Sequence, residues 1–224
     1  MFFLFSRVIL LNYNMLSINN IITSAVGYLP KWLAKPFANP YVAGENQEDV
    51  LKKVKVLNES GMCATIDMLG EHTKDQDEAK SVTNQYCEIF QKISGLNLDC
   101  NISVKPTHVG LDISYELARD NFLKLTTTAK KFSNFLRIDM ESSKVTSHTI
   151  KVYEECKSVY DKVGLVLQAY LKRSIDDLKL LSKQSFNSRI CKGIYNESSQ
   201  ISFNSRISIN ENYIKMAKLM HQSG

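Results

Sequence analysis

The sequence predicts an α/β fold in which parallel strands alternate with helices, either as a doubly wound sheet or as a (β/α) barrel. Two observations support this prediction. Apolar runs of strand length recur along the chain, and each run is followed by a stretch in which apolar residues have helical spacing. Each strand and helix together take roughly 25 to 35 residues, which is long enough for the helical crossover between parallel strands.

The composition is that of a globular chain with one main domain. Its 224 residues are 44% hydrophobic and 23% charged, which excludes a disordered, collagen-like or multi-span membrane protein. Lys and Arg outnumber Asp and Glu by 28 to 23 without forming a basic block, so we expect no nucleic-acid partner. The 5 cysteines are irregularly spaced and form no C-x-x-C motif. We therefore expect reduced thiols and a cytoplasmic location.

Residues 1–41 form an N-terminal apolar segment that we expect to be helical, and the main domain is expected over residues 42–224. Residues 2–11 are apolar but too short to span a bilayer. Arg7 lies inside this run, which is unlike a secretory signal. Three interpretations stay open: a helix docked on the domain, a helix in peripheral contact with a membrane, and an organellar presequence.

The predicted strands are five apolar runs in the main domain. They cover residues 62–69, 100–105, 135–140, 163–167 and 188–191. Helices are predicted over residues 78–93, 115–132 and 146–159, where apolar residues recur at helical spacing. Two further helices are predicted to be capped by Ser174 and Ser208, because each hydroxyl residue stands three positions before an acidic residue.

The positions of polar residues favour the barrel over the doubly wound sheet. The first strand is followed by Gly70 alone and by no G-x-G-x-x-G phosphate-binding turn. Polar residues instead lie within the strands toward their ends or just beyond them: Asp67, Glu71, Lys105, Asp139, Glu141, Gln168, Tyr170, Arg189, Lys192 and Tyr195. In a (β/α) barrel these strand ends meet at the face where chemistry is placed. We expect Lys105 or Arg189 to pair there with one of the two aspartates.

Such a site, with mixed charges and two basic groups, suits a small anionic or zwitterionic ligand, or the phosphates and pyrimidine ring of a flavin. No metal is expected, because the histidines do not have metal-ligand spacing. They are His72, His108, His148 and His221.

Several of these motifs resemble those of one enzyme family. In chain order they are PYVAGEN (40–46), ATIDMLGE (64–71), NISVKPTHVGLD (101–112), LRIDME (136–141), VLQAYLKRS (166–174) and RICKGIY (189–195). Together they resemble the motifs of the proline dehydrogenases, which are FAD-dependent (β/α)8 TIM barrels. The resemblance implies oxidation of L-proline to 1-pyrroline-5-carboxylate, with the electrons passed to a quinone.

The resemblance also implies a role for individual residues. Asp139 and Arg189 would form the catalytic core, with the guanidinium near the reactive nitrogen of the flavin. Lys105, Asp67 and Tyr195 would contact the substrate, and Met140, Gln168, Lys192, Gly193 and Ile194 would contact FAD.

The sequence also departs from the family pattern. Pro106 stands where the family has an aliphatic residue, and Ile194 stands where it has a small one. About five strand–helix units precede Gly224, so the expected barrel is incomplete. The alternative function is therefore an inactive remnant that binds flavin weakly, or one half of an enzyme whose second chain supplies the remaining units.

Overall fold

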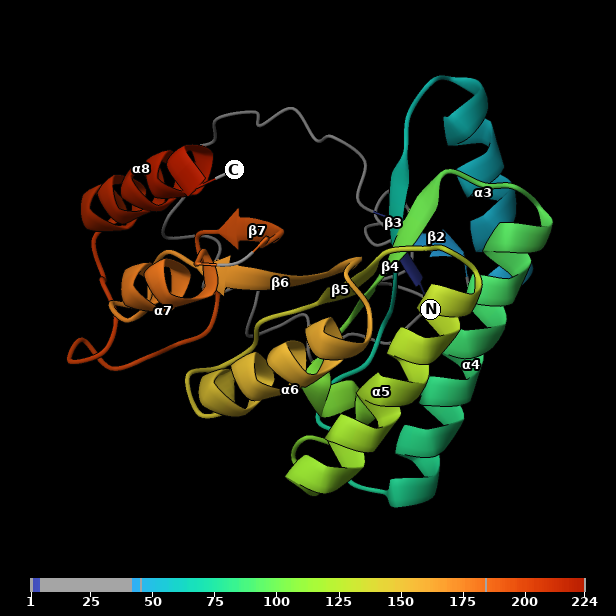
Figure 1. Ribbon diagram of the computed structural model, residues 1–224, viewed down its shortest axis with the longest axis horizontal. Coiled ribbons are helices and arrows are strands. Elements are labelled where there is room, and N and C mark those ends of the chain that lie inside the picture. The colour runs from blue at the N-terminus through green and yellow to red at the C-terminus, as the bar shows by residue number, and fades with distance from the viewer. Residues whose placement is uncertain (1, 5–41, 45, 184, 224) are drawn as a thin grey trace, which may run out of the picture. The chain divides into compact units, whose positions relative to one another are not determined.

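The computed structural model describes residues 2–4, 42–44, 46–183 and 185–223 (Figure 1). The chain divides into two compact units. Of the described residues, the first unit contains those up to Leu69 together with Asn97–Cys100, and the second contains Gly70–Leu96 and those from Asn101 onward. Of the predicted N-terminal segment, residues 2–4 form a strand and residues 5–41 lie outside the described residues. The expected helix is therefore wrong for residues 2–4, whereas the helix expected over the rest of the segment and the domain boundary at residue 42 stay predictions.

Among its described residues, the first unit contains three short strands and one helix. They are β1 (Phe2–Leu4), β2 (Val42–Gly44), α3 (Gln47–Glu59) and β3 (Ala64–Met68). Strand β1 pairs antiparallel with both β2 and β3. Helix α3 begins after Asn46, whose side-chain oxygen accepts a hydrogen bond from the Asp49 N–H at 2.9 Å. This bond satisfies one of the backbone donors that a helix leaves unpaired at its first turn.

The second unit contains a parallel sheet in the order β4, β5, β6, β7. These strands are β4 (Cys100–Val104, of which Cys100 belongs to the first unit), β5 (Leu136–Ile138), β6 (Val163–Gln168) and β7 (Ser188–Cys191). Neighbouring strands are parallel throughout. Each of the five predicted runs matches a strand, so the predicted strands are confirmed, and β4, β5 and β6 are largely buried, as parallel strands under helices are.

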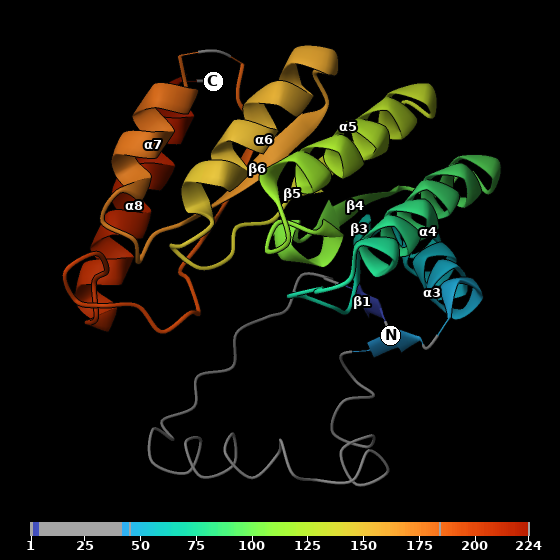
Figure 2. The ribbon, with the colours of Figure 1, turned by 90° about the horizontal axis from the view of Figure 1, so that it is seen from below.

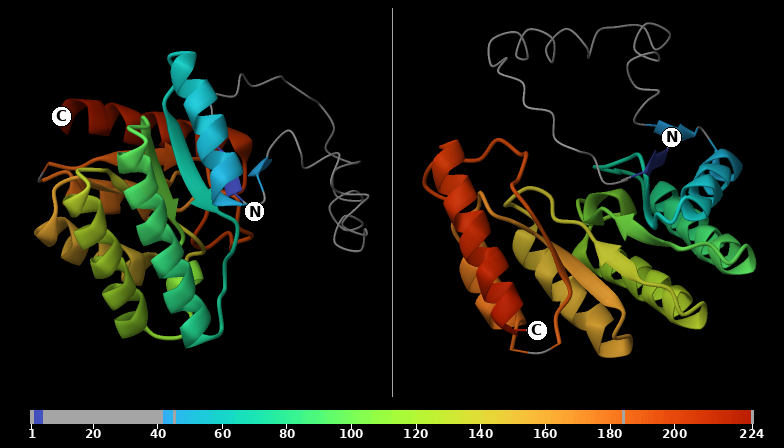
Figure 3. Two further views of the ribbon diagram at one scale, coloured as in Figure 1. Left: turned by 90° about the vertical axis from the view of Figure 1, so that its right-hand side faces the viewer. Right: turned by 90° about the horizontal axis from the view of Figure 1, so that it is seen from above.

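The helices of the second unit follow the strands in alternation. They are α4 (Gln76–Gly95), the 3-10 helix η1 (Pro106–Val109), α5 (Tyr115–Lys131), α6 (Thr146–Val159), α7 (Ser174–Leu181) and α8 (Arg206–Ser223). Helix α5 packs between α4 and α6, and α7 packs on α8. Figure 2 shows α4, α5 and α6 side by side on one face of the sheet. The right-hand view of Figure 3 looks onto the strands from the other side, with α5 and α6 behind them.

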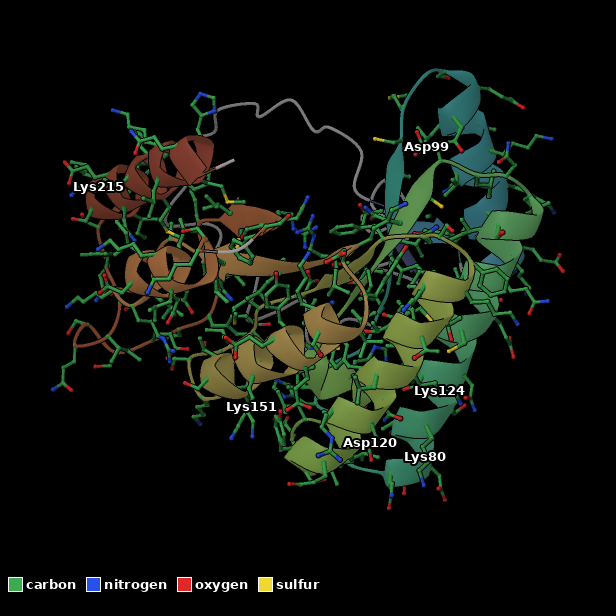
Figure 4. The ribbon with its side chains drawn as sticks, in the orientation of Figure 1. Lys80, Asp99, Asp120, Lys124, Lys151 and Lys215 are labelled. Carbon is green, nitrogen blue, oxygen red and sulfur yellow. The ribbon has the colours of Figure 1, made fainter. Side chains whose placement is uncertain are left out.

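The outward sides of these helices are charged. Figure 4 shows Asp120 and Lys124 projecting from α5, Lys80 from α4 and Lys151 from α6. Within the described part of the chain, no helix has both the length and the apolar character needed to cross a membrane.

Both predicted serine caps are wrong in detail. Ser174 is the first residue of α7, and its buried hydroxyl donates to the backbone oxygen of Gln168 at 2.6 Å. Helix α8 begins at Arg206, and Ser205 Oγ accepts from the Ser208 N–H at 3.0 Å. Ser174 thus bonds to the end of the preceding strand, and Ser205 takes the capping position predicted for Ser208. The spacing of a serine to an acidic residue does not reveal either arrangement.

The alternation of side chains gives the sheet two different faces. Fully buried apolar residues occupy every second position and lie under the helices; they are Ile102, Val104, Leu136, Ile138, Val163, Leu165 and Leu167. The register pairs Ser103 with Arg137, Arg137 with Gly164, and Val166 with Arg189. Residues paired in a parallel sheet point the same way. The opposite side, which we call the polar face, therefore carries Ser103, Arg137, Asp139, Gln168 and Arg189.

Candidate active site

The centre of the polar face is an ion pair between Asp139 and Arg189. Arg189 Nη2 donates to Asp139 Oδ1 at 2.5 Å, and Ser103 Oγ donates to the same oxygen at 2.6 Å. The Arg189 side chain is 37% exposed and that of Asp139 is 14% exposed. The predicted pairing of a strand-end base with a strand-end aspartate is thus confirmed for these two residues. Charge-assisted bonds of this kind fix the direction of both groups.

A second guanidinium on the polar face is that of Arg137, two residues before Asp139. Its nitrogens donate to the side-chain oxygen of Asn187 at 2.8 Å and to the backbone oxygens of Leu165 and Asn187 at 3.4 and 3.3 Å. Burial and the nearby Arg189 lower the pKa of Arg137 to about 10, against a smaller opposite effect of Asp139. Arg137 therefore stays protonated at neutral pH. The guanidinium groups of Arg137 and Arg189 thus lie on the same face of the sheet as Asp139.

Arg137 reaches Asn187 because β6 has a glycine in between. A Cβ on Gly164 would lie 2.5 Å from Arg137 Nη1 and 2.8 Å from the backbone oxygen of Asn187. The guanidinium also lies over the ring of Phe135, 4.7 Å from its centroid. Any larger side chain at residue 164 would occupy the space of the arginine.

Gln168 ends β6 with a buried amide whose two halves have different partners. Its Nε2 donates to the backbone oxygens of Met140 at 2.7 Å and Glu141 at 2.8 Å. Because carbonyl oxygens only accept, these bonds identify the nitrogen of the amide. Its Oε1 is buried and has no hydrogen-bond partner among the described residues. Gln168 therefore offers an acceptor, while its donors are used within the protein.

The loop after β5 is held by Glu141, which is 1% exposed. Thr107 donates to both carboxylate oxygens, from its backbone N–H at 2.8 Å and from its hydroxyl at 2.6 Å. Burial raises the pKa of Glu141, and the two bonds from Thr107 partly oppose that effect. Thr107 belongs to η1, which begins at Pro106. The proline thus starts a short helix after Lys105, where its missing N–H costs no strand pairing.

The loop before α4 bonds to the same region. The His72 N–H donates to Thr107 Oγ1 at 2.9 Å, and His72 Nδ1 lies 2.6 Å from Asp112 Oδ2. This hydrogen bond is the main reason that the pKa of His72 is raised. His108 is 6% exposed, and burial, followed by the charge of Lys105, lowers its pKa to about 4. His108 is therefore a neutral ring near Lys105.

The segment after β7 folds back over the ends of the neighbouring strands. The Ser143 backbone N–H and hydroxyl donate to Glu197 at 2.7 and 2.6 Å, and the Phe203 N–H donates to the Tyr170 backbone oxygen at 2.7 Å. Tyr195 lies half-buried on this segment, and its pKa is raised by burial and then by the charge of Glu141. The segment therefore brings Tyr195 near the loop after β5.

The three residues before Tyr195 are exposed: Lys192, Gly193 and Ile194. Gly193 has a φ of +103°, and a Cβ there would overlap the Tyr170 ring, so a side chain at this position would clash. Ile194 is 89% exposed and points away from the packed interior.

The remaining predicted site residues lie in different surroundings. Lys105 is half-buried and ends the extended segment that follows β4. Met140 is buried directly beside Asp139, and its backbone oxygen holds Gln168. Asp67 is buried at 3% exposure on β3, in the first unit, while the other predicted site residues belong to the second unit.

These side chains fit the flavin that the resemblance implies. A buried acceptor without a partner among the described residues, Gln168 Oε1, matches the imide N–H of a flavin ring. The two guanidinium groups on the polar face suit the negative charge of a reduced ring. Lys192 is exposed, and its ammonium group suits a phosphate-bearing chain.

Sequence reasoning misses two positioning contacts. Ser103 is detectable in principle, because alternation along β4 places it on the same side as Lys105. Thr107 follows Pro106 in a short 3-10 helix, and no periodicity identifies its partner Glu141 from 34 positions away.

Comparison with known proteins identifies what the chain is similar to. Residues 50–204 match the family model described as proline dehydrogenase. The chain is 37% identical over 187 residues to proline dehydrogenase 1 of Bacillus subtilis subsp. natto, an alignment that covers 84% of this chain and 62% of that protein. It is 30% identical over 199 residues to proline dehydrogenase 2 of Bacillus subtilis strain 168, which covers 87% of this chain and 66% of that protein. The chain thus spans less than two thirds of the length of these relatives.

A solved structure shares the fold. Proline utilization A from Bdellovibrio bacteriovorus, in a crystal structure inactivated by N-propargylglycine, matches with a TM-score of 0.78 and 22% sequence identity. The match covers 92% of this chain and 27% of that one. The predicted fold class, an α/β fold of the TIM-barrel family, is confirmed.

Proposed function

The chain belongs to the proline dehydrogenase family, and on that premise we propose that it binds FAD and oxidises L-proline to 1-pyrroline-5-carboxylate. When bound, FAD would supply the acceptor for the hydride that leaves the proline ring carbon next to nitrogen. A proton leaves the ring nitrogen in the same oxidation, so that the product carries a carbon–nitrogen double bond.

The observation that supports this proposal most is the ion pair of Asp139 and Arg189 on the same face as the free acceptor of Gln168. Arg189 stays partly exposed while Asp139 holds one of its terminal nitrogens. A guanidinium fixed in this way is oriented before any ligand arrives, which lowers the cost of stabilising negative charge.

The other predicted residues have roles consistent with this chemistry. Lys105 would bind the carboxylate of proline as a compact cation, and Asp67 and Tyr195 would contact the same substrate. Met140 would lie against the flavin ring, and Lys192, Gly193 and Ile194 would contact its ribityl and phosphate side. Gln168 would accept from the imide N–H of the ring through Oε1.

The experiment is an anaerobic titration of the FAD-loaded chain with L-proline, followed by the visible flavin absorbance. We expect bleaching by L-proline. We also expect Arg189→Met to abolish bleaching while some FAD stays bound, because the variant loses the guanidinium on the polar face but keeps the acceptor of Gln168.

The chain provides a matched control for this variant. The hexapeptide SFNSRI occurs at residues 185–190 and again at 202–207, and the second copy places Arg206 in an exposed position at the start of α8. Arg206→Met should bleach like the native chain. Equal bleaching rates for Arg189→Met and the native chain would contradict the role of Arg189.

Absence of bleaching in the native chain, with FAD bound, would instead favour the alternative of a flavin-binding module without turnover. Bleaching that occurs only after a second polypeptide is added would favour a split enzyme. The electron acceptor is proposed to be a quinone, which a soluble ubiquinone analogue tests by restoring the absorbance of the bleached chain.

A further inference from the structure

The amide of Gln168 is oriented by a loop rather than by its own strand. Its two donor bonds end on the backbone oxygens of Met140 and Glu141, which follow β5. The orientation of Oε1, which has no partner among the described residues, depends on the backbone oxygens of Met140 and Glu141 staying in place. The position of this loop therefore decides which way the acceptor points.

The loop is in turn fixed by the buried carboxylate of Glu141. Thr107 donates to both of its oxygens, at 2.8 Å from the backbone and at 2.6 Å from the hydroxyl. A buried carboxylate requires such donors, because burial without them disfavours its charged form strongly. Thr107 thus holds Glu141 in place. The backbone oxygens of Glu141 and of its neighbour Met140 in turn hold the Gln168 amide.

The hydroxyl of Thr107 also has a second partner. It accepts from the His72 N–H at 2.9 Å while it donates to Glu141. Its proton is therefore directed at the carboxylate, since the His72 N–H occupies an acceptor site of the hydroxyl oxygen. A side chain of the same shape without the hydroxyl would lose both contacts.

We propose that Thr107 is a positioning residue that acts through Glu141 to hold the Gln168 amide with Oε1 as the acceptor for a bound ligand. The identity of that ligand as FAD rests on the proposed function. Thr107 itself would touch neither FAD nor proline.

The test compares Thr107→Val with Thr107→Ser in the full chain. Valine keeps the shape and removes the hydroxyl, whereas serine restores it. We expect hydrogen exchange of the Gln168 side-chain amide, followed by NMR, to become about tenfold faster in the valine variant. We expect its FAD affinity to fall about tenfold, with both values returning to within about twofold of native in the serine variant.

Thr83→Val is the matched control, because Thr83 is also fully buried but donates to the Ala79 backbone oxygen of its own helix, at 2.8 Å. It should leave both the Gln168 amide exchange and the FAD affinity unchanged. If Thr107→Val fails to fold, Glu141→Gln replaces it, since that variant keeps one acceptor oxygen and should accelerate the amide exchange by a smaller factor.

The two readouts separate this inference from the proposed function. A native chain that binds no FAD would contradict the proposed function, and the amide exchange would still decide the role of Thr107. Unchanged amide exchange in Thr107→Val would overturn the inference. Faster exchange with unchanged FAD affinity would also overturn it, because the orientation of Gln168 would then not matter to the ligand.

Discussion

At the scale of single residues, the polar face is organised by shared acceptors. Asp139 Oδ1 accepts from both Ser103 and Arg189, and the Glu141 carboxylate accepts twice from Thr107. A carboxylate bonded in this way cannot rotate freely, so each of these groups has one direction before a ligand binds. The same region contains two histidines with opposite pKa shifts, and each makes the stability of the fold depend on pH.

His108 should make the chain less stable in mild acid. Its pKa is lowered to about 4 in the folded state, so the unfolded state takes up a proton first as the pH falls below 6.5. The associated stability is present above pH 6.5 and is lost toward pH 4, by up to about 3 kcal/mol. We expect His108→Phe to reduce this slope in urea unfolding measured between about pH 6.5 and pH 4.5. An unchanged dependence of the unfolding free energy on pH in His108→Phe would contradict a buried, neutral His108 ring in the folded state.

His72 should act on the alkaline side. Its pKa is raised in the folded state, mainly by the hydrogen bond with Asp112. The stability that this bond provides is therefore fully present below pH 6.5, and it is lost as the pH rises through the folded-state pKa. Because the His72 side chain is half-exposed, the effect should stay below about 1 kcal/mol. The backbone of His72 has a φ of +57°, a conformation that asparagine tolerates.

We therefore expect His72→Asn and Asp112→Asn to lose the same pH dependence in urea unfolding between about pH 6 and pH 8.5. A difference between the two variants in this range would show that His72 does not act through Asp112.

At the scale of elements, apolar runs of strand length between helical stretches are enough to predict the strands of the second unit. Residues 163–167 are predicted as a strand, and β6 extends over Val163–Gln168. Helix starts are harder to predict, because the hydroxyl of Ser174 bonds to the end of β6 rather than to its own helix. Such tertiary partners leave no local pattern in the sequence.

Gly164 is the element-scale position with the strictest requirement. A Cβ there would overlap Arg137 and the ring of Phe135. It would also lie 2.8 Å from the backbone oxygen of Asn187, which cannot move aside as a flexible side chain can. We expect Gly164→Ala to destabilise the chain by about 1 to 3 kcal/mol in urea unfolding.

Gly95→Ala is the control for this prediction. Gly95 ends α4, and a Cβ there would meet no atom within 4 Å. Because alanine favours the helix, this variant should be neutral or up to about 1 kcal/mol more stable. Equal changes in unfolding free energy for Gly164→Ala and Gly95→Ala would contradict the account that Arg137 passes over Gly164 to reach Asn187.

At the scale of the whole molecule, the sequence predicts the family and most of the polar face, but not how the face is held. Asp139, Gln168 and Arg189 are found because strand ends and family motifs coincide at these residues. The pairing of Thr107 with Glu141 is not predicted, because their contact joins a short 3-10 helix to a loop that lies 34 positions away in the sequence. Contacts of this kind depend on packing that residue spacing does not encode.

The central claim is that the polar face holds FAD. The measurement that tests it most directly is a titration of FAD with the full chain, followed by quenching of flavin fluorescence, with circular dichroism to show that each variant is folded. We predict saturable binding of one FAD per chain that Gln168→Leu weakens about tenfold or more. Quenching that does not saturate, or that is the same for the native chain and for folded Gln168→Leu, would contradict the claim.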